Sequence, residues 1–132
     1  MKGIGSRITK TLTIGSRLVC DDNSGAKEIM IIGVSGAGSK RNKNPSAGIG
    51  SVVTASVKKG KPEMVKKKVK AIIIRQKKEF KRPNGMTVCF EDNAAVLIND
   101  DFLPVGTEIK GTVAIEIAER YPKVSGISSS KM

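Results

Sequence analysis

The side chains in this sequence that are best suited to chemistry are cations, and they fall into three clusters. The first lies in the glycine-rich stretch 36–50, the second in 58–68 and the third in 75–82. Lysine and arginine bind phosphate oxygens, and arginine does so through a two-pronged fork of N–H donors. The residues that we expect to contact phosphate are Lys40, Arg41, Lys43, Lys58, Lys59, Lys61, Lys66, Lys67, Lys68, Arg75, Lys77, Lys78, Lys81 and Arg82.

The charge of the chain is large and unevenly distributed. Its 132 residues include 24 lysines and arginines against 12 aspartates and glutamates, a net charge of +12. Residues 39–82 hold 15 of the basic residues and 2 of the acidic ones, whereas residues 91–132 hold 4 and 7. A one-sided field of this kind attracts polyanions, and binding to nucleic acid is driven by the release of counterions. Solubility alone does not require such a pattern. We therefore expect a nucleic-acid ligand, and a protein neighbour for the acidic C-terminal third.

Other reactive residue types are sparse or badly placed for catalysis. The chain has no histidine, the residue most often used as a general acid or base near neutral pH. Cys20 and Cys89 stand apart in apolar runs, so the usual zinc sites have too few ligands. Acidic residues pair at 21–22, 91–92 and 100–101, but neighbours on a strand face opposite ways and do not converge. We expect no enzymatic activity, no metal site and no cofactor.

The glycine-rich stretch Gly36 to Gly50 (GAGSKRNKNPSAGIG) carries the first basic cluster. Glycine permits close approach of the backbone to a phosphate. The spacing is not that of a P-loop, because no GKS or GKT follows a four-residue gap, which disfavours a nucleotide cradle. We interpret it as a flexible basic loop that becomes ordered on RNA.

Short β-branched runs between turn residues must position these cations. In 51–59 (SVVTASVKK), Val53, Ala55 and Val57 alternate with polar residues, the period of a half-buried strand. Five such runs favour a small closed barrel, since closure removes exposed edges, although a sandwich fits the periodicity almost as well. The predicted strands are 17–20, 27–34, 51–59, 68–75 and 94–99.

A hairpin is predicted around Pro83-Asn84-Gly85, where Asn-Gly tolerates the positive φ angles of a type I′ turn. The arm before the turn carries basic residues, and the arm after it alternates Met86, Val88 and Phe90. The pattern predicts a protruding basic β-ribbon at 75–90, anchored at its base by apolar residues. Further on, 111–121 (GTVAIEIAERY) fits either a short helix or a strand, and the tail 122–132 is either loose or docked on a neighbour. No apolar run approaches a membrane span, and the N-terminus lacks the pattern of a secretory signal, so we expect a cytoplasmic protein.

The stretch 71–97 (AIIIRQKKEFKRPNGMTVCFEDNAAVL) resembles the signature of the universal large-subunit ribosomal protein fourteen family. The match rests on Ala71 before three isoleucines, a nine-residue gap to Asn84-Gly85, Phe90 five residues later, Asn93, and the closing Val96-Leu97. The stretches 20–34 (CDDNSGAKEIMIIGV) and 106–111 (GTEIKG) resemble the first hairpin and a late strand of the same family. The N-terminal extension and the ending ERYPKVSGISSSKM are similar to the archaeal and eukaryotic branch.

The resemblance implies a mainly β protein: a single RNA-binding domain over 1–132 with a five-stranded barrel, a β-ribbon and short C-terminal helices. Residues 1–13 would then be an N-terminal extension and 111–132 a C-terminal helical segment and tail. The implied function is that of a structural constituent of the large ribosomal subunit. The implied partners are large-subunit ribosomal RNA, neighbouring ribosomal proteins, small-subunit RNA across an intersubunit bridge, and an anti-association initiation factor. A free RNA-binding regulator or chaperone on a similar barrel is the alternative.

Overall fold

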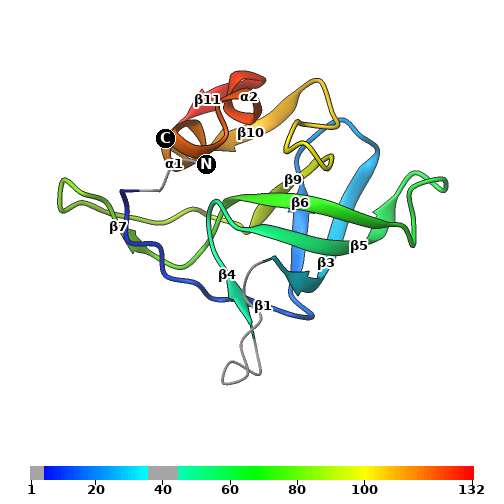
Figure 1. The fold of residues 1–132 in the computed structure, drawn as a ribbon, viewed down its shortest axis with the longest axis horizontal. Helices are drawn as coiled ribbons and strands as arrows, with labels where there is room; N and C mark the ends of the chain where they lie inside the picture. Colours follow the sequence, from blue (N-terminus) through cyan, green and yellow to red (C-terminus); the bar gives the residue numbers. More distant parts are fainter. Residues whose placement is uncertain (1–4, 36–44) are drawn as a thin grey trace.

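A computed structural model describes residues 5–35 and 45–132, and five of its strands close a barrel (Figure 1). Around the barrel the strands follow the order β2-β3-β5-β6-β9. Neighbours are antiparallel except β2 and β9, which are parallel. The strands are β2 (Arg17–Cys20), β3 (Ala26–Val34), β5 (Val52–Gly60), β6 (Lys68–Arg75) and β9 (Ala94–Ile98). This confirms the predicted closed barrel rather than the sandwich, with strand bounds within one residue of those predicted.

The barrel core follows from the alternation of apolar residues. Val53, Ala55 and Val57 of β5 are buried, while the residues between them are more exposed, as the period of two predicts. In β6, by contrast, the unbroken run 71–74 is buried on both faces. Ala71 and Ile73 belong to the cluster inside the barrel, whereas Ile72 and Ile74 pack with residues of the C-terminal segment. A continuous run of isoleucine is what a strand covered on both faces requires.

The seam between β2 and β9 is short and is reinforced by a buried carboxylate. Only two residue pairs join the strands in register, Val19 with Ala94 and Cys20 with Ala95. Beyond them the Asp22 carboxylate accepts a hydrogen bond from the backbone N–H of Leu97 at 3.0 Å. Asp22 also accepts one from the thiol of Cys20 at 3.1 Å. A side chain thus continues the strand pairing where the backbone of β2 has ended.

The C-terminal segment covers one side of the barrel with β10 (Ile109–Val113), α1 (Ile115–Arg120), α2 (Pro122–Gly126) and β11 (Ser128–Lys131). Both the strand and the helix predicted as alternatives for 111–121 occur there, one after the other. The strand β10 ends at Val113 and the helix α1 begins at Ile115. The strand persists to Val113 because β10 pairs in parallel with β11. The tail is docked on the chain itself, with Val124 buried beside Ile117 in the second core cluster. No helix in the described part of the chain is long and apolar enough to cross a membrane.

The predicted ribbon forms from β7 (Phe80–Lys81) and β8 (Thr87–Val88) and projects at one end of the molecule (Figure 1). Its turn differs from the prediction. Gly85 has a φ of +85°, but Asn84 does not have a positive φ, so the type I′ assignment is wrong. The Gly85 N–H donates to the Arg82 carbonyl and the Arg82 N–H donates to the Met86 carbonyl, both at 2.9 Å. This is a type I turn with Pro83 in its favoured second position, followed by a glycine bulge.

Candidate nucleic-acid interface

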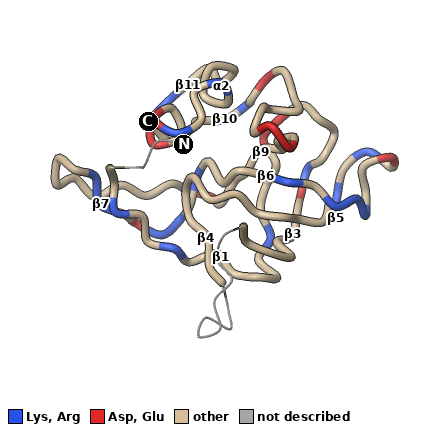
Figure 2. The backbone as a smooth tube through the Cα atoms, in the orientation of Figure 1, with Lys and Arg blue, Asp and Glu red and all other residues tan. Residues whose placement is uncertain are grey.

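Six of the predicted lysines lie together around the loop that joins β5 and β6. We call this set the hairpin surface, and all six side chains are exposed. It lies at the end of the long axis of the molecule opposite to the ribbon (Figure 2). Backbone hydrogen bonds hold the loop: Lys61 N–H donates to the Gly25 carbonyl at 2.9 Å and Lys66 N–H to the Val57 carbonyl at 2.8 Å. The hairpin surface consists of Lys58, Lys59, Lys61, Lys66, Lys67 and Lys68.

The hairpin surface has little acidic charge to neutralise it. Within residues 5–35 and 45–132 only Lys59 of this set pairs with a carboxylate, at 3.8 Å from Glu28. Such an exposed pair contributes little and is easily exchanged for another anion. Lys70, which the sequence analysis did not select, continues the surface along β6 and pairs with Asp100 at 3.0 Å. Its place two residues after Lys68, on the same face of a strand, is a signal that was available in the sequence.

A second group of exposed lysines lies on the ribbon. We call Lys77, Lys78 and Lys81 the ribbon surface. Phe80 is buried beneath it, so the neighbouring Lys81 points to the opposite, solvent side. Lys78 pairs with Glu79 at 2.9 Å, and both side chains are about half exposed. The ribbon surface therefore presents exposed cations beside a side chain, Phe80, that is buried in the core.

Gln76 holds the base of the ribbon and was not among the residues predicted to be functional. Its side chain is fully buried, and its N–H groups donate to the carbonyls of Thr9 and Lys78, both at 3.0 Å. Its carbonyl oxygen accepts from the backbone N–H of Ile49 at 3.0 Å. One amide thus joins the N-terminal segment, the ribbon and the segment after β4 (Ser46–Ala47). A lone glutamine between basic residues gives no sign of this role in the sequence.

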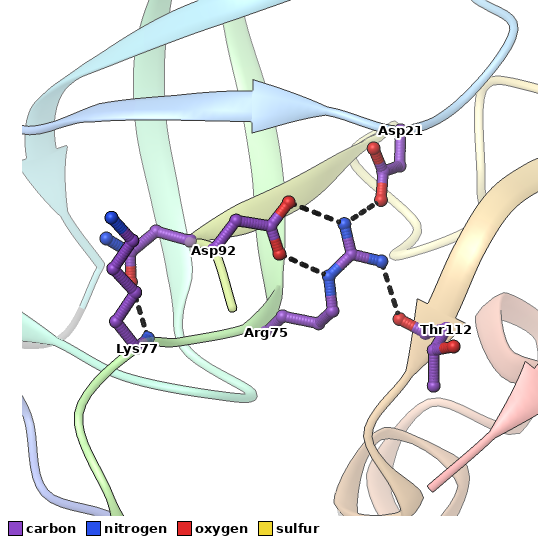
Figure 3. Close-up of polar contacts among 6 residues, drawn as sticks. Asp21, Arg75, Lys77, Asp92 and Thr112 are labelled. Atoms are coloured by element: carbon purple, nitrogen blue, oxygen red, sulfur yellow. Dashed lines mark hydrogen bonds and ion pairs between the residues drawn. The ribbon is translucent and has the colours of Figure 1, made fainter. Parts of the chain in front are cut away.

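Arg75 was predicted to bind phosphate, but its guanidinium forms hydrogen bonds and ion pairs with other residues of the protein (Figure 3). Its Nε and Nη2 donate to the two carboxylate oxygens of Asp92 at 2.8 and 3.1 Å, and Nη2 also pairs with Asp21. Its Nη1 donates to the backbone carbonyl of Thr112 at 2.8 Å. Burial lowers the pKa of Arg75, but the hydrogen bond to Asp92 and the two carboxylate charges outweigh it and raise the pKa above its ordinary value. Because only 10% of the side chain is exposed, we leave Arg75 out of the proposed interface.

Arg82 is also held by internal partners. Its Nε donates to Oε1 of Glu116 at 2.8 Å, and its Nη2 donates to a main-chain oxygen of Met132. Its guanidinium lies 5.7 Å from the ring centroid of Phe80, close enough for a cation–π contact. Arg82 therefore ties the ribbon to the C-terminal segment, and its contact with phosphate stays a prediction from the sequence.

The remaining predicted contacts lie in the first cluster. Lys40, Arg41 and Lys43 lie outside the described residues. Among the residues that are described, no group of three or more acidic or cysteine side chains could hold a metal ion. The interface that can be built from geometry thus consists of the hairpin surface and the ribbon surface.

Comparison with known proteins identifies the family of the chain. The model of the family described as ribosomal protein L14p/L23e matches residues 11–132. "Large ribosomal subunit protein uL14" of Methanococcus vannielii is 53% identical over 128 residues, which cover 97% of both chains. The proteins with the same name from Methanocorpusculum labreanum and Methanospirillum hungatei are 49% and 44% identical, each over 98% of both chains. The likeness to these archaeal proteins spans the barrel, the ribbon and the C-terminal segment. The chain therefore belongs to the ribosomal protein L14p/L23e family, in its archaeal-type branch.

Proposed function

We propose that this chain is a structural, non-enzymatic constituent of the large ribosomal subunit that binds large-subunit ribosomal RNA. The proposal is supported by the presence of two exposed lysine surfaces on a protein that belongs to a ribosomal family. The relatives are named as proteins of the large ribosomal subunit. A cationic surface with few acidic partners is the electrostatic footprint of a nucleic-acid-binding protein.

The position of the two surfaces supports contact with two separate segments of RNA. They lie at opposite ends of the long axis, so one phosphate backbone segment would be bound at each end (Figure 2). Lysine acts on phosphate as a mobile point charge, which suits recognition of backbone and shape rather than base sequence. Lys40, Arg41 and Lys43 remain proposed contacts, on the basis of their charge and the glycine-rich sequence around them.

Partner contacts follow from the family and from the acidic part of the chain. Residues 91–132 carry net negative charge, which suits protein neighbours better than RNA. We extend the proposal to contacts with neighbouring ribosomal proteins, to bridges with small-subunit RNA and to docking of an anti-association initiation factor. These finer roles rest on the resemblance to the family.

Fluorescence anisotropy with a short labelled duplex from large-subunit ribosomal RNA tests RNA binding. We expect affinity to fall linearly with salt on logarithmic axes, with a slope of about 0.9 or somewhat less for each phosphate contacted. Changing Lys66, Lys67 and Lys68 together to glutamine should reduce both affinity and slope, whereas Lys123→Gln on α2 serves as the matched control. Equal binding by the triple variant and the control would contradict the proposal for the hairpin surface.

A free RNA-binding regulator is the second candidate function, because lysine surfaces alone would also give broad, weak RNA binding. The two functions differ in residence on the ribosome. A structural constituent stays in the large subunit through a high-salt wash, whereas a regulator that exchanges with a free pool is released.

A further inference from the structure

The N-terminal segment pairs with the ribbon at one residue, through an isolated β-bridge. Arg7 forms an antiparallel bridge with Lys81, and the Arg7 N–H donates to the Lys81 carbonyl at 2.9 Å. On its other side Lys81 pairs with Thr87 of β8. The three residues therefore stand directly opposite one another on three adjacent stretches of chain, with Lys81 in the middle.

Directly opposite residues of antiparallel strands present their side chains on the same face, with Cβ atoms about 4.5–5.5 Å apart. Because Phe80 is buried, the face that carries Lys81 is the solvent face. Arg7, Lys81 and Thr87 are all exposed. We call this transverse set of two cations and one hydroxyl the cross-ribbon row.

The cross-ribbon row is unfavourable for the protein alone. Like charges placed directly opposite one another on neighbouring strands repel and destabilise the pairing. In the part of the chain that the structure describes, neither Arg7 nor Lys81 forms an ion pair with a carboxylate. An anion bound between the two side chains would remove this repulsion.

Contacts away from the charges hold the N-terminal segment in this position. The Ser6 hydroxyl donates to Oε1 of buried Glu116 at 2.9 Å, and the Thr9 carbonyl accepts from Gln76 at 3.0 Å. The segment also passes so close to Gly48 that a Cβ there would lie 2.6 Å from Cγ2 of Ile8. Arg7 lies between Ser6 and Thr9, so its backbone is fixed on both sides and its side chain is kept beside Lys81.

We propose that the cross-ribbon row binds one phosphate group of an RNA backbone, with Arg7 and Lys81 sharing its charge and Thr87 donating a hydrogen bond. Arginine, lysine and threonine are common donors to nucleic-acid phosphates, and the arginine fork can engage two oxygens of one phosphate. The inference rests on the proposed RNA-binding function. The inference adds Arg7 of the N-terminal segment to the proposed RNA interface. It also assigns one phosphate to two cations.

The test compares Arg7→Gln, Lys81→Gln, the double variant and the control Lys123→Gln by anisotropy on the labelled ribosomal RNA duplex over a series of salt concentrations. Each single variant should bind more weakly, with a salt slope reduced by up to about 1. If the two cations share one phosphate, the salt slope of the double variant is also reduced by about 1 rather than about 2. The melting temperature of each single variant should equal or exceed that of the wild type, because the repulsion is relieved. Thr87→Val keeps shape and charge and should lower affinity without changing the slope.

Unchanged binding by Arg7→Gln would overturn the inference, as would a loss of slope of about 2 in the double variant. If Lys77→Gln and Lys78→Gln weaken binding while Arg7→Gln does not, the proposed function stands and only the cross-ribbon row is rejected. If the wild-type protein does not bind the duplex, both the proposed function and the cross-ribbon row are rejected.

Discussion

Arg82 and Glu116 form an ion pair in which Nε of the arginine lies 2.8 Å from Oε1 of the glutamate. Only 18% of the arginine side chain and 2% of the glutamate side chain are exposed. The same carboxylate oxygen accepts from Ser6, so a single buried glutamate joins the N-terminal segment, the ribbon and α1. The ribbon is therefore a fixed projection of the barrel, and its lysines are presented in a defined direction.

Glu116→Gln should destabilise the protein, because the charge of Arg82 would remain largely buried without its carboxylate. We expect a loss of about 2 kcal/mol in the free energy of unfolding, below the range for fully buried pairs since Arg82 retains some solvent contact. Urea denaturation of the variant measures it. Glu119→Gln, at an exposed position on the same helix, is the matched control. An equal effect of the two substitutions would show that the Arg82 ion pair does not stabilise the fold.

Arg75→Lys keeps the charge but removes the fork that bonds Asp92, Asp21 and the Thr112 carbonyl at once. We expect the free energy of unfolding to fall by about 2–3 kcal/mol, because the ammonium group of lysine cannot replace at least two of the charge-assisted hydrogen bonds. The salt dependence of RNA binding should not change. Arg17→Lys, at an exposed ion pair with Glu28, is the control and should lose no more than about 1 kcal/mol. A large loss in salt slope with stability preserved would return Arg75 to the RNA interface.

The two cysteines should differ sharply in reactivity. Burial, the charge of Asp22 and the hydrogen bond to Asp22 raise the pKa of the Cys20 thiol from 9.0 to about 12, while Cys89 is exposed. Iodoacetamide should alkylate Cys89 in the native protein and Cys20 only after unfolding, because the thiolate is the reactive species. Peptide mass spectrometry after timed labelling distinguishes them. Rapid native labelling of Cys20 would mean that the seam between β2 and β9 opens readily.

The same thiol makes stability depend on alkaline pH. The folded-state pKa lies above the unfolded value, so the contribution of Cys20 is fully present below pH 9 and is lost as pH rises from 9 to about 12. Urea denaturation at pH 8, 9 and 10 should therefore show a steeper decline for the wild type than for Cys20→Ala. The comparison with Cys20→Ala removes every contribution to the pH dependence that the two proteins share. Parallel curves would contradict the raised pKa.

The hairpin surface and the ribbon surface should contribute independently to RNA binding, because they lie at opposite ends of the barrel. One variant has glutamine in place of Lys66, Lys67 and Lys68, a second has it in place of Lys77 and Lys78, and a third combines all five changes. The loss of binding free energy in the third variant should equal the sum of the losses in the first two. Distant sites with no shared partners add within about 0.5 kcal/mol. Anisotropy titrations of the three variants measure this. A combined loss well below the sum would indicate that both surfaces compete for the same RNA segment.

The sequence predicted the parts of this structure that depend on local pattern. The period of two in β5 and the isoleucine run of β6 marked these strands, since side-chain direction along a strand is set by the backbone alone. A closed barrel was favoured because closure removes exposed strand edges, but the periodicity fitted a sandwich almost as well, and only the structure decides between them. Positive φ was predicted for both Asn84 and Gly85, but only Gly85 has it. Pro83 favours the second position of a type I turn, which places Asn84 in the third position with negative φ.

The parts that could not be predicted depend on residues distant in sequence. Arg75 and Arg82 look like phosphate ligands because their acidic partners, Asp21 and Glu116, lie 54 and 34 residues away. Only the fold brings them together. The same holds for Arg7, whose place beside Lys81 depends on Gln76 and on Glu116. A polar N-terminal segment gives no periodic signal, so its pairing with the ribbon appears only in the structure.

Sedimentation of cell lysate through a sucrose gradient, with and without a high-salt wash, tests the central claim most directly. We predict that the tagged wild-type protein is recovered in stoichiometric amount with the large-subunit fraction and survives the wash. The variant with Lys66, Lys67, Lys68, Lys77 and Lys78 changed to glutamine should be recovered there in reduced amount or be lost in salt. Recovery of the wild type near the top of the gradient, or its release by the wash, would contradict the claim and favour a free RNA-binding regulator.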